Sequence, residues 1–230
     1  MHRWDVTPQE AVAIQRTLAE QVITQGRLDA LRHVAGVDVG FEQRGAVTRA
    51  AVAVLRFPEL ELIEKSVVRA PTCFPYIPGL LSFREIPAVL SAIEQLTHPV
   101  DVYLCDGQGY AHPRRFGIAC HLGVLLDKPA IGVAKTRLIG QCRGNLPAER
   151  GQWCELVHRD EVIGAVLTTR VGVKPLYVSI GHRVSLAEAV RVTMACTTRF
   201  RLPETTRWAH RLASAPDDGV AGPDFSPRSW

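Results

Sequence analysis

The stretch HVAGVDVGF, residues 33–41, is apolar at almost every position around a single aspartate, Asp38. A short apolar run of this kind is typical of a buried β-strand. Two further runs follow, TRAAVAVLRF (48–57) and LELIEKSVVR (60–69), with only Pro58-Glu59 between them. The three segments therefore predict three consecutive strands in hairpin order at the start of a sheet.

The rest of the chain alternates between helical and strand-like segments. Capping boxes, in which Ser or Thr precedes Glu by three residues, predict helix starts at Thr7, Ser82 and Ser185. The expected helices cover about residues 8–25, 82–96, 116–126, 185–197 and 203–212, and the expected strands cover 102–105, 129–134, a hairpin over 153–169, and 176–180. This order predicts an α/β fold with a mixed sheet flanked by helices on both faces. We expect one domain over residues 1–213 and a disordered tail over 214–230, which is rich in Pro, Gly and Asp.

The composition is that of a globular protein. The chain has 230 residues, of which 47% are hydrophobic and 22% charged, so it can bury a substantial core. Its apolar runs are too short to span a bilayer and its N-terminus lacks an apolar signal core, so we expect a cytoplasmic monomer without a membrane partner. The net charge of +4 permits a polyanionic partner without requiring one. Arginines concentrate over residues 191–211, where they indicate either nucleic-acid contact or a solvated helix face.

The six cysteines, at positions 73, 105, 120, 142, 154 and 196, include no C-x-x-C pair. Their spacing fits neither a zinc site nor a disulfide framework. We therefore expect all six thiols to be reduced.

Three carboxylates stand out by their surroundings. An ionised aspartate in a strand as apolar as that around Asp38 requires a partner or a cation, unless the strand ends early and Asp38 lies in a turn. Asp106 ends the apolar strand VYLC and opens the segment DGQG, which is compatible with either a turn or a site at a strand end. Glu85 is compatible with either a capping role beside Ser82 or a site role. Clustered carboxylates without a matching cation favour Mg²⁺, for which Mn²⁺ can substitute, because hard cations prefer oxygen ligands.

Other polar residues fit a phosphoryl-transfer site. Lys135 directly follows the apolar strand AIGVA, so its ammonium group should emerge at the sheet edge, where it could stabilise a charged transition state. His112, in YAHPRRFG, could contact a phosphate from a loop. His210 lies on the predicted last helix. The alternatives are a surface lysine and half-exposed histidines.

The segment Pro75-Tyr76-Ile77-Pro78-Gly79 holds an aromatic and a β-branched residue between two prolines. Proline fixes its own φ and pushes the preceding residue toward extended geometry. The pair Tyr76-Ile77 is therefore predicted to lie on a stiffened loop, followed by a flexible glycine.

Several of these segments together resemble the endonuclease V family. The matching stretches are AGVDVGFE (35–42), PYIPGLLSFRE (75–85), DGQGYAHPRRFGIACHLG (106–123), GVAKTRLIG (132–140) and LPETTRWAHRL (202–212). The resemblance runs in order from about residue 10 to 212. It implies a ribonuclease H-like fold and a metal-dependent endonuclease of DNA repair. Such an enzyme hydrolyses the second phosphodiester bond 3′ to a deaminated purine (hypoxanthine), leaving 3′-hydroxyl and 5′-phosphate ends.

The resemblance also implies residue roles. Asp38, Glu85 and Asp106 would hold Mg²⁺, His210 would assist at the metal or the attacking water, and Lys135 would contact phosphate. Tyr76 would be the wedge that enters the stack where the lesion base leaves it. The implied lesion-binding residues are Tyr76, Ile77, Pro78, Gly79, Leu80, Gly107, Gln108, Gly109 and His112, with DNA containing deoxyinosine as the partner.

Three alternatives remain open at this point. An inosine-specific endoribonuclease would use the same chemistry on RNA. A non-catalytic nucleic-acid binder would not need three carboxylates, which repel phosphate unless a cation intervenes. Sugar kinases and actin-like ATPases share faintly similar Asp-Gly segments, but they are generally larger, with two such domains around the nucleotide.

Overall fold

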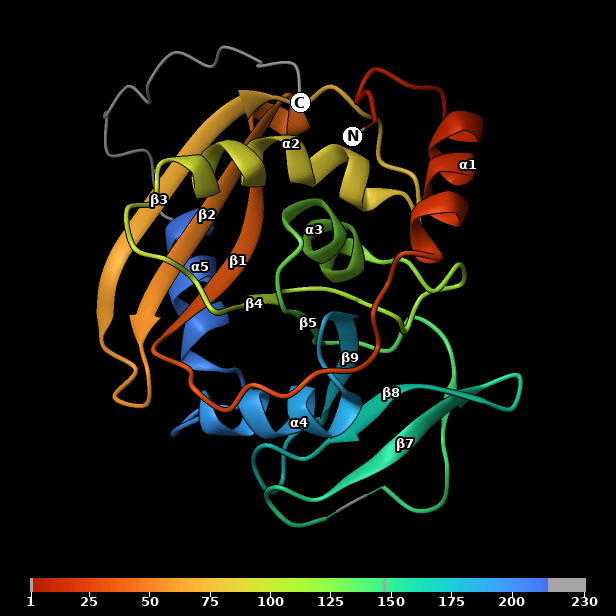
Figure 1. Cartoon of the computed structure of the whole chain (residues 1–230), viewed down its shortest axis with the longest axis vertical. Helices are drawn as coiled ribbons and strands as arrows, with labels where there is room; N and C mark the ends of the chain where they lie inside the picture. The colour runs from red at the N-terminus through yellow and green to blue at the C-terminus, as the bar shows by residue number, and fades with distance from the viewer. Residues whose placement is uncertain (1, 147, 215–230) are drawn as a thin grey trace.

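The computed structural model describes residues 2–146 and 148–214. Over these residues the strands form one nine-stranded sheet in the order β3-β2-β1-β4-β5-β9-β8-β7-β6 (Figure 1). The strands are β1 (His33–Glu42), β2 (Val47–Arg56), β3 (Leu62–Pro71), β4 (Val102–Cys105), β5 (Ala130–Ala134), β6 (Gln141–Cys142), β7 (Trp153–His158), β8 (Glu161–Leu167) and β9 (Leu176–His182). The helices are α1 (Pro8–Ala19), the 3₁₀ turn η1 (Gln43–Gly45), α2 (Leu81–Glu94), α3 (Ile118–Leu126), α4 (Leu186–Ala195) and α5 (Glu204–Ser214).

The sheet is mixed, as its sequence predicted. β1 pairs antiparallel with β2 and β2 with β3, which confirms the hairpin order of the first three strands. β1, β4 and β5 are parallel neighbours, and β9 pairs antiparallel with β5. Parallel pairing places the carboxyl ends of β1, β4 and β5 at one edge of the sheet, where residues that follow these strands can meet.

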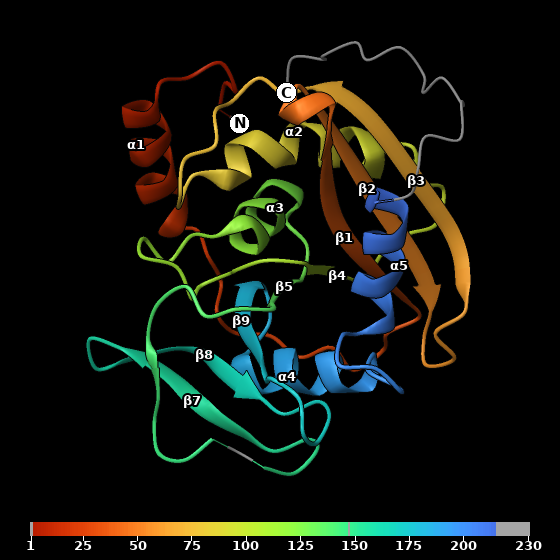
Figure 2. The same cartoon turned by 180° about the vertical axis from the view of Figure 1, so that it is seen from behind.

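Helices cover both faces of the sheet (Figures 1 and 2). On one face, Ile86 and Val89 of α2 and Leu122 of α3 belong to one buried cluster together with Val52 of β2. On the other face, Val190 of α4 belongs to the second buried cluster, together with residues of β4, β5, β8 and β9. The predicted α/β class, with a mixed sheet between two helical layers, is confirmed.

The three predicted capping boxes have three different outcomes. At Thr7 the box is complete, because its side chain and that of Glu10 cap each other's backbone N–H groups. Ser185 accepts from the Glu188 N–H at 3.3 Å, whereas the Glu188 carboxylate accepts from the backbone of Leu28. The box at Ser82 was wrong: α2 is capped by Leu80 without a side-chain bond. The Ser82 hydroxyl instead lies 3.0 Å from His121 Nδ1. Glu85 is therefore free of the capping role.

Two boundaries also differ from expectation. α1 ends at Ala19 and does not continue to residue 25. Its continuation is tied to β9 instead, because Ile23 donates its N–H to His182 and accepts from the Arg183 N–H. The short elements β6 and η1 were not predicted. The predicted disordered tail, apart from residue 214, falls outside the described residues, and the domain boundary stays a prediction.

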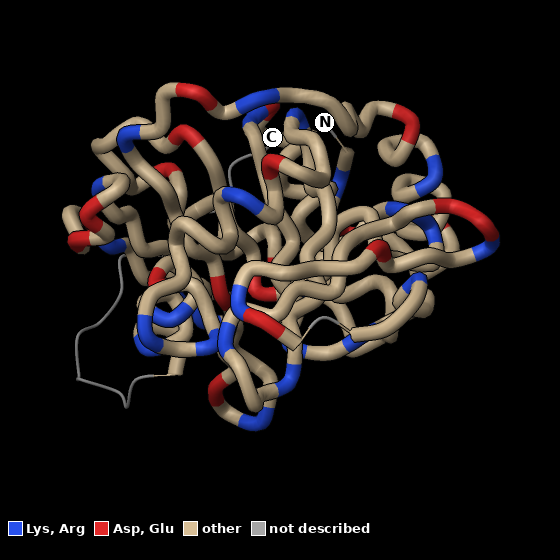
Figure 3. Tube along the Cα trace, turned by 90° about the horizontal axis from the view of Figure 1, so that it is seen from below, with Lys and Arg blue, Asp and Glu red and all other residues tan. Residues whose placement is uncertain are grey.

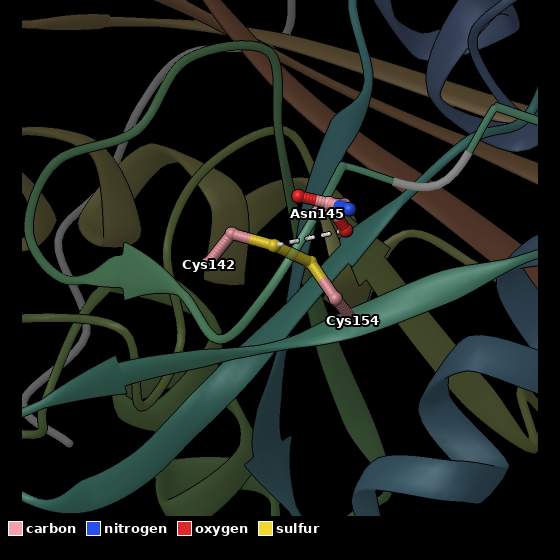
Figure 4. The surroundings of a disulfide bond; sticks show 3 residues. All are labelled: Cys142, Asn145 and Cys154. Carbon is pink, nitrogen blue, oxygen red and sulfur yellow. Dashed lines mark hydrogen bonds between the residues drawn. A yellow bond between two sulfur atoms is a disulfide. The ribbon is translucent and has the colours of Figure 1, made fainter.

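The expectation of six reduced thiols was wrong. Cys142 on β6 and Cys154 on β7 form a disulfide (Figure 4), with their Cα atoms 6.1 Å apart. The two residues are 12 positions apart in sequence, and the antiparallel pairing of β6 with β7 brings them together. A search for closely spaced cysteine pairs cannot detect such a partner. Cys73, Cys105, Cys120 and Cys196 are free.

Along the backbone trace in Figure 3, positions of Lys and Arg are interspersed with positions of Asp and Glu. None of the helices in residues 2–146 and 148–214 has the length and apolarity needed to cross a membrane.

Candidate active site

Asp38 and Asp106 meet because β1 and β4 are parallel neighbours. Val37 and Cys105 are register partners, so the two aspartates each follow a paired position at the same sheet edge. The Asp106 N–H donates to the Val37 carbonyl at 3.0 Å, which fixes the two segments together. Asp106 directly follows the end of β4, whereas Asp38 lies within β1, paired with Ala51 of β2, and not in a turn.

His210 reaches Asp38 because two glycines let α5 lie directly on β1. Gly36 and Gly40 alternate with Asp38, so all three face the same side of the strand. A Cβ atom on Gly36 would lie 2.0 Å from the Thr205 carbonyl oxygen, and one on Gly40 would lie 2.4 Å from that of Ala213. At this close approach, His210 Nδ1 lies 2.7 Å from Asp38 Oδ2.

Asp38, Asp106 and His210 form a potential metal-binding group. One ligand atom from each residue lies within 4.8 Å of those of the other two. The donors are two carboxylate oxygens and an imidazole nitrogen, a set suited to a divalent cation. A divalent-metal site at this edge of the sheet agrees with the chemistry expected from the sequence.

Glu85, predicted as the third carboxylate ligand, lies outside that group of three but interacts with it electrostatically. Burial, followed by repulsion from Asp38 and Asp106, raises its pKa to about 8. Burial and the neighbouring Asp106 also raise the pKa of Asp38. Burial is the larger cause in both residues and repulsion between the carboxylates the smaller one, so both effects disfavour the ionised forms in the metal-free protein.

Lys135 emerges beside the carboxylates, as its position after β5 predicted. Its ammonium group forms an ion pair with Asp106. Arg201, from the segment before α5, donates to the Lys135 carbonyl at 2.6 Å and so ties the backbone of this residue. The ammonium group of Lys135 is therefore held beside the carboxylates.

A cavity of about 420 Å³ opens next to these residues. Its lining includes Glu85, Asp106 and Lys135, together with Tyr76, Pro78 and Gly79 of the proline-bounded loop. Tyr76 is 68% exposed, although aromatic side chains are usually buried. The arrangement combines charged side chains, a recess and an exposed aromatic ring within one surface.

The model of the family described as "Endonuclease V" matches residues 16–211. The chain belongs to the endonuclease V family. Endonuclease V of Trichormus variabilis is 58% identical over 214 residues, which cover 93% of this chain and 96% of the relative. Endonuclease V of Azotobacter vinelandii is 54% identical and covers 92% and 95%. The resemblance inferred from the sequence motifs is confirmed.

Solved structures of endonuclease V share the fold. That of Streptomyces avermitilis superposes with a TM-score of 0.86 at 43% identity, covering 91% of this chain and 92% of the other. Human endonuclease V gives 0.82 at 35% identity, covering 90% and 96%. The Ciona intestinalis protein gives 0.79 at 26% identity over 89% and 95%, and its structure is a complex with a 24-mer DNA that contains an inosine followed by a ribo-adenosine. The ribonuclease H-like fold class is confirmed by these endonuclease V structures.

The remaining site residues predicted from the endonuclease V motifs divide into two sets. Tyr76, Pro78, Gly79, Gly107, Gln108 and His112 line the cavity. Ile77, Leu80 and Gly109 are not among its lining residues. Leu80 is 2% exposed and packs in a buried cluster with Phe83. The Gly109 N–H donates to the Ser179 hydroxyl at 2.9 Å, so this part of the loop is packed onto β9.

His112 lies in the cavity wall as a neutral, buried ring. It is 4% exposed. Burial, aided by Arg114, lowers its pKa to about 4. Its Nδ1 accepts from the Arg114 N–H at 3.2 Å. A phosphate contact by His112 stays a prediction, and an uncharged ring would have to make it.

Sequence reasoning missed several lining residues, including Gln15, Ser82 and Arg137. Gln15 is a polar residue of α1 between the apolar residues Ile14 and Leu18. Its burial, to 1% exposure, became evident only from the structure.

Proposed function

We propose that this protein is a metal-dependent endonuclease of DNA repair that recognises deaminated purine, above all deoxyinosine. It hydrolyses the second phosphodiester bond 3′ to the lesion and leaves 3′-hydroxyl and 5′-phosphate ends. The observation that carries the proposal is the adjacency of the Asp38–Asp106–His210 group to a cavity flanked by the exposed Tyr76. Family membership and the inosine-containing DNA bound by the Ciona intestinalis relative support the substrate class.

The residues of the site fit a divalent cation, for which we propose Mg²⁺ with Mn²⁺ as a substitute. Asp38 and Asp106 would hold it, and Glu85 would add a carboxylate from α2. The raised pKa values of Asp38 and Glu85 support this assignment, since a bound cation would stabilise carboxylates whose ionisation is disfavoured by burial and, after it, by mutual repulsion. A bound cation of this kind supplies an activated water and neutralises phosphoryl charge.

The protein's own side chains orient and balance the reacting groups. An imidazole that donates from Nδ1 to Asp38 presents Nε2 for proton transfer, so His210 is proposed to assist the attacking water. The Lys135 ammonium group, held at Asp106, is proposed to stabilise negative charge on the phosphate in the transition state. His210 belongs to α5, and Lys135 directly follows β5.

Lesion recognition is assigned to the cavity and to the loop at residues 75–79. Reading hypoxanthine requires rotating the nucleotide out of the stack, which costs a few kcal/mol of unstacking. A rigid wedge at Tyr76 would fill the vacated space at little entropic cost. The backbone around Gly79, Leu80 and Gly107–Gly109, with Ile77, Pro78 and His112, is proposed to surround the extruded base.

The test is cleavage of matched DNA and RNA oligonucleotides, each carrying one inosine, with Mg²⁺ and with chelator. We expect Mg²⁺-dependent nicking of the DNA at the second bond 3′ to the lesion. Preferred cleavage of RNA would instead favour an inosine-specific endoribonuclease. Binding without cleavage would favour a non-catalytic binder. Action as a monomer and a cytoplasmic location are part of the same proposal.

Asp38→Ala should abolish Mg²⁺-dependent nicking and leave lesion binding partly intact, because the carboxylate serves the chemistry and the loop at Tyr76 serves recognition. Gel-based cleavage and fluorescence anisotropy measure the two properties on one oligonucleotide. Asp29→Ala, at a side chain that is 72% exposed, is the matched control. Unchanged cleavage by the Asp38 variant would contradict the catalytic assignment.

A further inference from the structure

Gln15 on α1 is a buried side chain whose amide is fully engaged. It is 1% exposed. Its Nε2 donates to the carbonyls of Gly79 at 3.0 Å and Phe116 at 3.2 Å, and its Oε1 accepts from Arg114 Nε at 2.5 Å. A glutamine amide has two N–H donors and one carbonyl acceptor, so each group has a partner. The side chain thereby joins α1 to two loops that are distant in sequence.

The Gly79 carbonyl is the point where these contacts converge. Arg114 Nη2 donates to it at 2.6 Å, in addition to the bond from Gln15. Gly79 has a φ of +81°, and a Cβ at this position would lie 2.8 Å from Arg114 Nη2. The close approach of Arg114 thus depends on glycine, and the carbonyl is held from two sides.

The held carbonyl lies at the base of the projecting loop. Two prolines stiffen residues 75–78 internally, but a stiff arm positions its tip only when its base is fixed. The preceding residue, Phe74, is 4% exposed and packs in the buried cluster that also contains Ala11 of α1. Tyr76 is 68% exposed between these two anchored ends. Gln15 also lines the same cavity as Tyr76 and Gly79.

We propose that Gln15 is a positioning residue for lesion recognition, which fixes the loop of Tyr76 by donating to the Gly79 carbonyl. It acts through Gly79 and Arg114, since all of its polar groups are used within the protein. The inference rests on the proposed function, because it assigns the loop to lesion binding. Gln15 lies one position before residues 16–211, the range matched by the family model.

The test compares Gln15→Met with Gln9→Met, the same change at an exposed position of the same helix. Affinity for an oligonucleotide with one deoxyinosine and for the undamaged strand is measured by fluorescence anisotropy, alongside KM, kcat and Tm. For Gln15→Met we expect about tenfold weaker lesion binding, the effect of losing one hydrogen bond to a positioned carbonyl. The loss should appear in KM, with kcat at saturating substrate, affinity for the undamaged strand and Mn²⁺ binding unchanged. Gln9→Met should resemble the wild type.

Equal losses for damaged and undamaged strands, or lesion affinity equal to that of the wild type, would overturn the assignment. If Gln15→Met does not fold, Gln15→Glu replaces it, because a carboxylate keeps the bond from Arg114 and removes the donor to Gly79. Selective loss of lesion binding in Gln15→Glu supports the inference, and full retention overturns it. Wild-type protein that binds no inosine-containing strand would show a failure of the proposed function itself, and the inference would fall with it.

Discussion

Asp38 is an acidic residue in an apolar strand, and the groups that surround its charge come from several parts of the chain. Its Oδ1 accepts from the Val39 N–H at 2.8 Å, and its Oδ2 lies 2.7 Å from His210. Burial, followed by repulsion from Asp106, raises the pKa of Asp38. At the scale of single residues, the ionised form of Asp38 is therefore disfavoured in the metal-free protein, and a divalent cation would stabilise it.

Tyr76→Ala should weaken binding of a deoxyinosine strand about tenfold, because the exposed ring is proposed to stack at the lesion. Metal affinity should stay unchanged, because the carboxylates are proposed to bind the metal without Tyr76. Anisotropy titration and Mn²⁺ titration measure the two quantities. Tyr76→Phe keeps the ring and should retain most of the affinity. Equal lesion binding by the alanine variant would rule out the wedge.

Glu85→Gln should abolish cleavage yet stabilise the metal-free protein at alkaline pH. In the unfolded chain the carboxyl group loses its proton near the ordinary glutamate pKa of 4.5, whereas in the folded protein it keeps the proton up to about pH 8. Stability should therefore fall as pH rises through this window and level off above it. The glutamine variant should show a smaller fall, with a residual slope because the pKa of Asp38 is raised too.

The measurement is Tm in chelator at about pH 5 and pH 9, where each kcal/mol gained in the free energy of unfolding corresponds to about 2–4 °C. Glu94→Gln, at an exposed position of the same helix, is the control. An identical pH dependence in wild type and Glu85→Gln would contradict the raised pKa.

At the scale of elements, the packing of α5 on β1 sets the relation between His210 and Asp38. The helix contacts the strand backbone at Gly36 and Gly40, which lie two positions before and two positions after Asp38. The two glycines of GVDVG allow a helix to approach the strand more closely than larger side chains would. The close contact forms only because α5 packs at this place.

Gly36→Ala should lower stability by about 1–3 kcal/mol through overpacking. Cleavage should fall further than the folded fraction does, because the new Cβ would meet the Thr205 backbone and displace α5 with His210. Urea unfolding and single-turnover cleavage measure the two effects. Gly172→Ala, at an open position with a φ of +74°, adds backbone strain without a clash and should keep full activity per folded molecule. Equal activity per folded molecule in both variants would show that α5 does not depend on this contact.

At the scale of the whole molecule, the net charge is only +4, and basic and acidic positions are interspersed along the backbone trace (Figure 3). Affinity for nucleic acid must therefore come from local cations, such as Lys135 and Arg137 at the cavity. Phosphate contacts of this kind release counterions, so they depend on salt and not on the base.

Raising salt from about 50 to about 200 mM should weaken binding of the deoxyinosine strand about tenfold or more, with log affinity linear in log salt concentration. The undamaged strand should show the same slope, so the ratio of the two affinities should stay constant. Anisotropy titrations at several salt concentrations measure both. A slope near zero would contradict binding through phosphate contacts.

The sequence by itself determined the family, the α/β class and most elements, because apolar runs, prolines and glycines act over short distances. It also indicated Asp38, Glu85, Asp106, Lys135 and His210 as candidate site residues. Only the tertiary structure decided which partners they have: strand pairing joined Asp38 to Asp106, and the close approach of α5 brought in His210. It also decided that Cys142 bonds to Cys154, that Ser82 faces His121 and that Gln15 holds Gly79. The physical reason is that these contacts join segments separated along the chain, so their geometry depends on how whole elements pack and not on local propensity.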